Sequence, residues 1–130
     1  MATFGPVDPR WLALDRLFAP YLPPELPDAR TTDLRGPFES DQGVESLLAT
    51  AGLSDVRTAR TLIEVTFTGP ERWLAFSWSH GQRAMWEAVP LDLRERVRLE
   101  TFIQLDEIAA ADGHLRCSQD VRYTLGRRSA

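Results

Sequence analysis

The chain has 130 residues and a formal net charge of -4, with 43% hydrophobic and 26% charged residues. This composition predicts one globular domain, residues 1–130, with a core of its own. The acidic balance, without any block of basic residues, argues against a protein that binds nucleic acid.

The sequence also contains no feature typical of export or of membrane insertion. Cys117 is the single cysteine, which excludes an internal disulfide. The N-terminus lacks a basic segment followed by an apolar run, and no stretch of about 18 apolar residues predicts a membrane span. We therefore expect a cytoplasmic protein.

The first third of the chain predicts a short strand, a helix and a loop. Residues 2–5 are expected to form a strand, and Asp8 followed by Pro9 predicts the start of a helix that ends at Pro23-Pro24. Residues 23–37, rich in proline, are expected to form a loop. Spacings of three and four predict one apolar face on the helix, formed by Trp11, Leu14, Phe18 and Tyr21.

The middle of the chain predicts a helix, a strand and further helices. Ser40 is expected to cap a helix that runs to about Ala51, and residues 56–67 alternate as a strand does. A third helix begins at Pro70, after a cap at Thr68 or Gly69, and a break is expected near Gly81. The longest helix is predicted from Pro90 to Ala111, with two apolar stripes. The first stripe consists of Leu93, Val97, Thr101, Leu105 and Ile108; the second consists of Leu99, Phe102 and Ile103.

The last part of the chain predicts a strand over residues 115–125 and a frayed tail over residues 127–130. One face of this strand is expected to be apolar, with Leu115, Cys117, Val121, Tyr123 and Leu125. The other face is expected to be polar, with Arg116, Ser118, Asp120, Arg122 and Thr124.

Several segments, in order, resemble class I methyltransferases that use S-adenosylmethionine (SAM), in particular type 11/12-like members. Residues 3–11 are similar to the exit from that family's fifth strand. Residues 47–56, LLATAGLSDV, resemble the junction into its sixth strand, and residues 67–73, FTGPERW, resemble the entry into its helical insertion. Residues 120–128, DVRYTLGRR, look like its seventh strand.

The resemblance implies the C-terminal, substrate-side half of that family. The fold would be α/β, or α+β in isolation. It would be a partial methyltransferase fold with a short sheet, an antiparallel final strand and a helical insertion, about residues 70–111, that covers the sheet. The family holds SAM on a glycine-rich loop, but no two glycines here are closer than seven residues (Gly36 and Gly43). We therefore expect no SAM binding by this chain alone, and SAM as cofactor only if a partner half completes the site.

Residues 78–86 contain the densest set of groups able to do chemistry. His80 is a candidate catalytic acid or base, because histidine exchanges protons near neutral pH, and Arg83 is a candidate to hold an oxyanion. Six residues are candidates to bind substrate: Trp11, Tyr21, Trp73, Trp78, Met85 and Trp86. The alternative is that the aromatic residues are core residues and that His80 satisfies a helix end. Two histidines far apart and one cysteine predict no metal site.

Three functions remain open at this point. The first is the substrate-binding domain of a methyltransferase that acts on a small molecule, such as a natural product. The second is a cofactor-free biosynthetic enzyme, a cyclase or isomerase, on a degenerate methyltransferase fold. The third is a non-catalytic interaction protein or a truncated fragment. An incomplete sheet leaves edges and apolar area uncovered, so we expect a homodimer or a chain that carries the SAM-binding half as partner.

Overall fold

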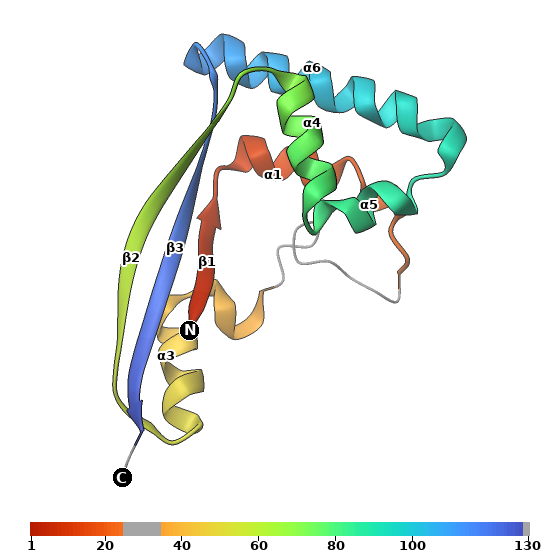
Figure 1. Cartoon of the computed structure of the whole chain (residues 1–130). Coiled ribbons are helices and arrows are strands. Elements are labelled where there is room, and N and C mark those ends of the chain that lie inside the picture. The colour runs from red at the N-terminus through yellow and green to blue at the C-terminus, as the bar shows by residue number, and fades with distance from the viewer. Residues whose placement is uncertain (25–34, 129–130) are drawn as a thin grey trace. The chain divides into compact units, whose positions relative to one another are not determined.

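The computed structural model describes residues 1–24 and 35–128 and arranges them as a mixed α/β fold (Figure 1). The strands are β1 (Ala2–Val7), β2 (Leu53–Phe67) and β3 (Leu115–Arg128). The α-helices are α1 (Pro9–Arg16), α3 (Asp41–Thr50), α4 (Pro70–Ser79), α5 (Gln82–Ala88) and α6 (Arg94–Asp112). Short 3-10 helices are η1 (Ala19–Tyr21), η2 (Gly36–Glu39) and η3 (Leu91–Leu93).

The chain forms two compact units. The first consists of Met1–Val7, Leu34–Glu64 and Ser118–Ala130, and the second consists of Asp8–Asp33 and Val65–Cys117. Strands β2 and β3 contribute residues to both units. The single domain expected over residues 1–130 stays a prediction.

The strands are hydrogen-bonded in the order β1-β3-β2. β3 runs antiparallel to β1, with Ala2 opposite Tyr123. On its other side, Thr58 Oγ1 lies 3.1 Å from Thr124 Oγ1, while the Ser54 hydroxyl donates to the Arg127 carbonyl at 3.3 Å. Residue numbers therefore rise along β2 as they fall along β3, so this pair is antiparallel as well. The predicted antiparallel final strand is confirmed.

In the first unit, η2 and α3 lie over one face of the sheet, and Arg122 ties them to it. The Arg122 side chain is fully buried. It donates to the Asp41 carboxylate and to the carbonyl oxygens of Phe4, Phe38 and Glu39. A buried guanidinium is tolerated only when its charge is balanced and its donors are used, and these four partners meet both conditions.

Helix α3 begins where the sequence predicts. The Ser40 hydroxyl accepts a hydrogen bond from the backbone N–H of Gly43 at 3.0 Å, which is a side-chain N-cap. Gly43 is required there for a steric reason, since a Cβ on it would lie 2.2 Å from the Pro37 carbonyl oxygen. The buried stripe of this helix contains Val44 and Leu48.

The predicted assignment of the two faces of β3 is wrong beyond Val121. Arg122 and Thr124 are buried, at 0% and 1% exposure, whereas Tyr123 and Leu125 are 42% and 52% exposed. The reason is that η2 and α3 cover the face that carries Arg122. Within the described part of the first unit, no helix lies over the other face (Figure 1). The alternation of residues along β3 correctly predicts which side chains share a face, but it does not predict which face α3 covers.

We expect the free energy of unfolding to fall in acid, and Asp41 to contribute to this fall. Hydrogen bonds from the Arg60 side chain, reinforced by Arg122, lower the pKa of Asp41 below its ordinary value of 3.8. A carboxyl whose folded pKa is lowered contributes stability that is complete above the unfolded pKa and is lost as pH falls through the folded pKa. The loss from Asp41 should therefore begin near pH 4 and continue below it.

Urea unfolding between about pH 7 and pH 3 checks this expectation. Asp41→Asn should flatten the acid limb of the profile. The profile should not become fully flat, because hydrogen bonds from Arg10 also lower the pKa values of Asp8 and Asp112. An identical acid limb in wild type and Asp41→Asn would contradict the assignment.

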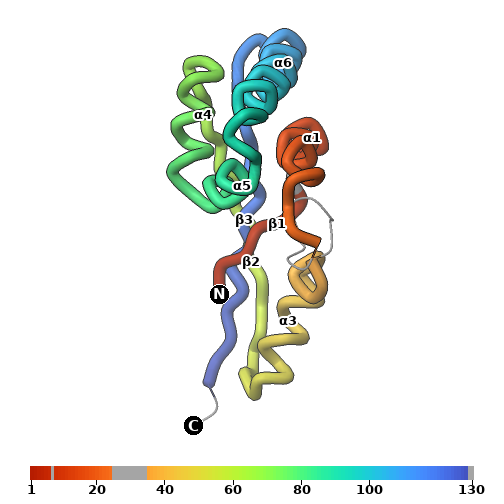
Figure 2. The backbone as a smooth tube through the Cα atoms, turned by 90° about the vertical axis from the view of Figure 1, so that its right-hand side faces the viewer, coloured from red at the N-terminus to blue at the C-terminus, as the bar shows by residue number. Residues whose placement is uncertain are grey.

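The second unit builds its core on helix α6. Residues of the first predicted stripe are buried along it: Val97, Thr101, Leu105 and Ile108. On the second stripe, Leu99 and Ile103 are 50% and 60% exposed. Helix α4 packs against both α5 and α6, and α1 also contacts α6 in the same unit (Figure 2). These elements contribute the buried side chains of Trp11, Leu14, Phe18, Trp73, Met85, Trp86 and Val89.

Two helix boundaries differ from the predictions. Helix α1 ends at Arg16 rather than before Pro23, and η1 follows. The cause is Pro20, which has no N–H to donate to the Arg16 carbonyl and would clash with it in a continued helix. Helix α6 begins at Arg94 rather than at Pro90, because η3 forms the intervening turn.

The remaining boundaries lie close to the predicted ones. α4 follows Gly69, and the break near Gly81 separates α4 from α5, as predicted. β3 extends to Arg128, so the predicted fraying is wrong at residues 127–128. Residues 129–130, and residues 25–34 of the predicted loop, lie outside the described part of the chain.

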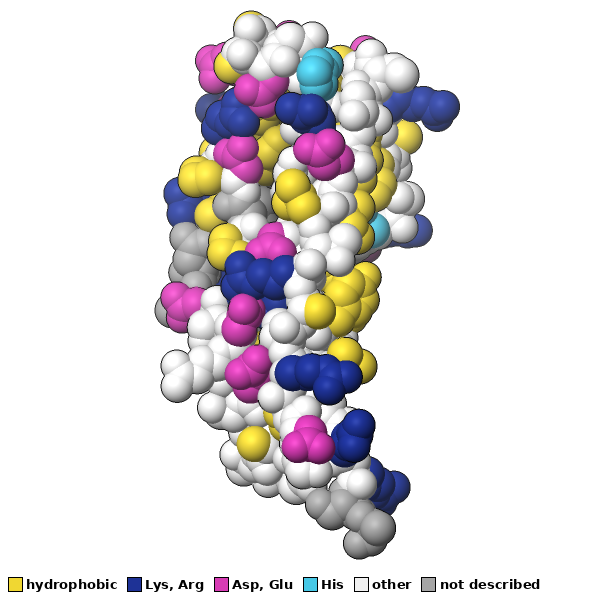
Figure 3. Space-filling model, turned by 90° about the vertical axis from the view of Figure 1, so that its left-hand side faces the viewer, with side chains coloured by type: hydrophobic (Ala, Val, Ile, Leu, Met, Phe, Trp, Pro, Cys, Tyr) yellow, Lys and Arg dark blue, Asp and Glu magenta, His cyan; other side chains and the backbone are white. Residues whose placement is uncertain are grey.

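Charge is mixed over the surface, and no described helix is both long and apolar enough to cross a membrane. On the face drawn in Figure 3, arginine side chains alternate with aspartate and glutamate. Short ion pairs account for part of this alternation, for example Arg60 with Asp41 at 2.8 Å and with Asp120 at 3.0 Å. Such a surface offers little to a polyanion.

Candidate functional site

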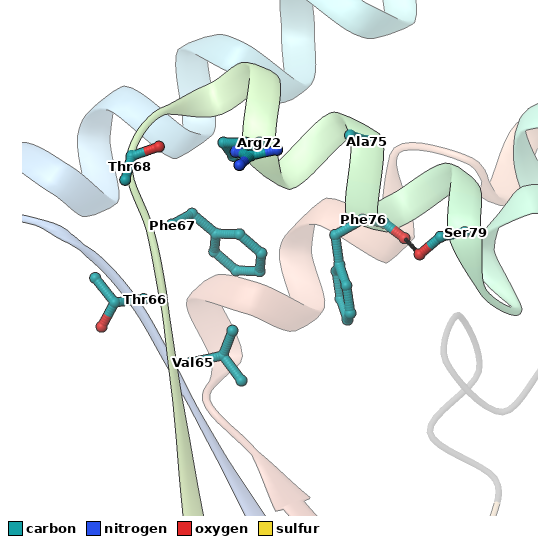
Figure 4. A pocket seen from close by; sticks show the side chains of 8 residues that line it. All are labelled: Val65, Thr66, Phe67, Thr68, Arg72, Ala75, Phe76 and Ser79. Carbon is teal, nitrogen blue, oxygen red and sulfur yellow. Dashed lines mark hydrogen bonds between the residues drawn. The ribbon is translucent and has the colours of Figure 1, made fainter.

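The second unit contains an open groove between the end of β2 and helix α4 (Figure 4). Its volume is about 440 Å³. β2 and the turn after it supply Val65, Thr66, Phe67 and Thr68, and α4 supplies Arg72, Ala75, Phe76 and Ser79. Because side chains alternate along a strand, Val65 and Phe67 point toward α4 while Thr66 points away from it.

The aromatic rings of Phe67 and Phe76 form the apolar part of the groove. Their centroids are 5.4 Å apart with the planes tilted by 50°, so the two rings are in contact. Phe76 is 45% exposed and Val65 is 38% exposed. The groove therefore presents apolar surface to solvent, as binding clefts for small molecules do.

Arg72 supplies the positive charge of the groove. No acidic residue is among the eight that line it. Over the described residues, the Arg72 side chain takes part in no ion pair or hydrogen bond, and its backbone N–H donates to the Gly69 carbonyl. Arg83 and Arg96 on neighbouring helices are instead each paired with a glutamate four residues later. An apolar groove with one unpaired guanidinium at its rim suits a ligand that is apolar and carries a negative charge.

The predicted substrate-binding residues lie behind this groove, and none of them lines it. Trp11, Trp73, Met85 and Trp86 are 7%, 3%, 1% and 1% exposed, respectively. Trp11 touches the groove indirectly, since its ring centroid is 6.1 Å from that of Phe67. Its buried indole N–H has no acceptor within the described residues. The role of these four residues in substrate binding stays a prediction; in the fold they are core residues.

Trp86 is the centre of an aromatic stack. Its indole N–H donates to the buried Ser77 hydroxyl at 2.7 Å. Phe18 meets it edge-on at 4.8 Å, and Trp78 stacks on it at 5.7 Å. Trp78 is half-buried, and the Arg94 guanidinium lies 5.8 Å from its ring. Tyr21, the remaining predicted substrate-binding residue, is also half-buried, on η1.

His80 lies beside the groove, and Arg83 lies one turn further along the chain. The His80 ring meets Phe76 edge-on at 4.3 Å, and His80 Nδ1 accepts a hydrogen bond from the backbone N–H of Gln82 at 3.1 Å. The Arg83 side chain is exposed and forms an ion pair with Glu87 at 2.8 Å. The His80 ring therefore contacts one wall of the groove, and the catalytic roles of both residues stay predictions.

The four residues of α4 that line the groove are not among the site residues predicted from the sequence. Arg72, Ala75, Phe76 and Ser79 recur at i, i+3, i+4 and i+7 and so share one face of the helix. The opposite side, with Trp73 and Ser77, is the buried one. The periodicity of this helix therefore contains a second face, with an arginine and a phenylalanine, from which the groove could have been predicted.

The glycines of the described chain do not form a glycine-rich loop, since no two of them are closer than seven residues. The family that the sequence resembles holds SAM where several glycines let the backbone approach it closely. Here the closely packed glycines accommodate the chain itself: a Cβ on Gly5 would lie 2.5 Å from Asp120 Oδ2, and one on Gly126 would lie 2.9 Å from the Leu53 Cβ. Neither belongs to a loop between a strand and a following helix that could hold a nucleotide.

Other reactive groups are scattered. No group of three or more histidine, cysteine, aspartate or glutamate side chains gathers within residues 1–24 and 35–128 in a way that could hold a metal ion. Burial, aided by the charges of Asp8 and Asp15, raises the pKa of the Cys117 thiol. Cys117 is thus poorly suited to act as a nucleophile.

Comparison with curated proteins links the chain to a methyltransferase. It is 32% identical over 91 residues to nocamycin O-methyltransferase from Saccharothrix syringae, which is 70% of this chain and 32% of that protein. The chain thus spans about a third of the length of this curated relative. The similarity supports a distant relationship between this chain and methyltransferases. No known protein family matches the sequence, and no solved structure matches the chain.

Proposed function

We propose that this chain is the substrate-side portion of a SAM-dependent methyltransferase that acts on a small molecule. The similarity to nocamycin O-methyltransferase carries the proposal, because it extends over 70% of the chain. The SAM-binding segment would be supplied by sequence beyond these 130 residues, either on the same polypeptide or on a partner. The close packing of Gly5 and Gly126 against the chain itself supports the proposal that other sequence binds SAM.

The uncovered face of the sheet supports the same proposal. Phe4 and Tyr123 lie on the face of the sheet opposite Arg122, with Phe4 65% exposed. Ile63 and Leu125 add apolar surface there, at 42% and 52% exposure. A sheet with one apolar face open to solvent is typical of a surface that another element covers. In this proposal the SAM-binding half covers it; a second copy of the chain is the alternative.

Within this proposal, His80 and Arg83 are the candidate catalytic residues. His80 contacts Phe76 in the groove wall, so its ring is within reach of a bound ligand. The same observation favours the cofactor-free enzyme as a second candidate function, since His80 would be its acid or base. Turnover that is lost in His80→Ala and does not require SAM would distinguish the second candidate from the first.

We expect the purified chain to show no heat of binding when SAM is titrated into it. Sedimentation of the same sample should report whether the chain is a monomer or a dimer. A titration curve that gives a dissociation constant in the micromolar range, a binding free energy on the order of −8 kcal/mol, would overturn the proposal that the SAM site lies in other sequence. A dimer without SAM binding would favour a second copy over the SAM-binding half as the cover of the open sheet face.

A further inference from the structure

We propose that the groove between β2 and α4 binds a small molecule with an apolar, ring-sized body and a single carboxylate. Its volume of about 440 Å³ suits such a ligand, since pockets for small molecules span roughly 300–1,000 Å³. The inference deepens the proposed function and rests on it, because the ligand would be the methyl acceptor.

The apolar body of the ligand is argued from the two phenylalanine rings. In Figure 4 the Phe67 ring extends from the end of β2 toward α4 and lies beside the Phe76 ring, and Val65 extends the same surface along β2. Phe76 keeps 45% of its surface exposed although it touches Phe67 and His80. A planar apolar ligand that lies against these rings would remove that surface from water and add ring contacts.

The carboxylate is argued from Arg72. Its guanidinium is exposed, lines the groove and takes part in no ion pair within the described chain, while no acidic side chain lines the groove. Guanidinium presents paired N–H donors that match the two oxygens of a carboxylate. The two phenylalanine rings and the Arg72 guanidinium therefore favour a ligand that has both an apolar ring system and a carboxylate.

A hydroxyl at the far end of the α4 face adds a second polar contact. Ser79 donates its hydroxyl hydrogen to the Phe76 carbonyl at 2.6 Å, so its oxygen remains able to accept (Figure 4). Arg72 and Ser79 are seven residues apart on α4, which corresponds to two helical turns, or about 10 Å. A ligand of two fused rings can span that distance, with its carboxylate at Arg72.

The test uses the full 130-residue chain and two probes of nearly equal shape. 2-Naphthoate carries the carboxylate, and 2-naphthamide is its neutral counterpart. Backbone amide shifts in a two-dimensional NMR spectrum follow each titration. We expect tighter binding of naphthoate, shifts at Thr68, Arg72, Ala75 and Ser79, and weaker naphthoate binding at high salt.

Three variants separate the contributions. Arg72→Gln should weaken naphthoate binding about fivefold and leave naphthamide binding unchanged, because an exposed charge pair contributes up to about that factor. Phe76→Ala should weaken both probes about tenfold. Arg57→Gln is the matched control, since Arg57 is also exposed and lies outside the groove, and it should change neither affinity.

Equal affinities for the two probes, shifts that map elsewhere, absence of binding at millimolar concentration, or unchanged binding in Arg72→Gln would each overturn the inference. These outcomes do not depend on SAM. If naphthoate does not bind as expected and the chain also does not bind SAM, only the proposed ligand class is rejected. Micromolar SAM binding with naphthoate in the groove would reject the proposed function alone.

Discussion

Replacing Arg122 with alanine is expected to lower the free energy of unfolding by about 3–5 kcal/mol, measured by urea denaturation. Arg122 is fully buried and donates to Asp41 and to three backbone carbonyl groups. Its removal takes the Arg122 donors away from Asp41 and from those carbonyl oxygens and opens a cavity between η2, α3 and the sheet. Each of these consequences is destabilising in its own right.

Two further variants test the reason for this loss. Arg122→Lys keeps the charge but cannot supply donors in several directions, so we expect it to recover only part of the stability. Arg57→Ala removes an exposed arginine from the same unit and should change the free energy of unfolding by less than about 0.5 kcal/mol. A loss below about 1 kcal/mol in Arg122→Ala would show that η2 and α3 do not depend on this side chain.

Replacing Trp86 with alanine is expected to cost about 3–5 kcal/mol of unfolding free energy. Trp86 is 1% exposed and contacts Phe18 and Trp78, while its N–H is the donor to the buried Ser77 hydroxyl. Alanine removes the ring from the centre of this stack and leaves Ser77 without that donor. Trp78→Ala should cost less, because Trp78 is only half-buried.

A second variant at this position, Trp86→Phe, distinguishes a core role of Trp86 from the substrate-binding role predicted for it. Trp86 does not line the groove. A folded Trp86→Phe variant should therefore bind naphthoate as the wild type does, with reduced stability as its main defect. A Trp86→Phe variant of near-normal stability that no longer binds the probe would instead support the substrate-binding role.

The position of the candidate site could not be predicted from the chemistry of the side chains alone. Tryptophan, methionine and histidine led to the prediction of site residues within residues 78–86, yet Met85 and Trp86 are buried in the core. The groove is formed by residues that are less conspicuous in sequence, such as Phe67 and Arg72. They come together because the chain turns between β2 and α4, which places the end of a strand against one face of a helix.

Local patterns in the sequence predict most of the helices and strands and several of their ends. Ser40 and Gly69 mark helix starts, Gly81 marks the break between α4 and α5, and alternation predicts β3. These features are local, because caps, glycine conformations and periodicity depend on neighbours within a few residues.

Which faces of these elements are buried, and which residues line the groove, depends on contacts between distant segments. The burial of Arg122 depends on Asp41 and on the carbonyl groups of Phe38 and Glu39, more than 80 residues earlier in the chain. Likewise, Arg72 becomes a groove residue because the end of β2 comes to lie against one face of α4, and no acidic side chain is among the residues that line the groove. Burial and pairing of this kind are set by contacts between distant segments, which no local pattern in the sequence encodes.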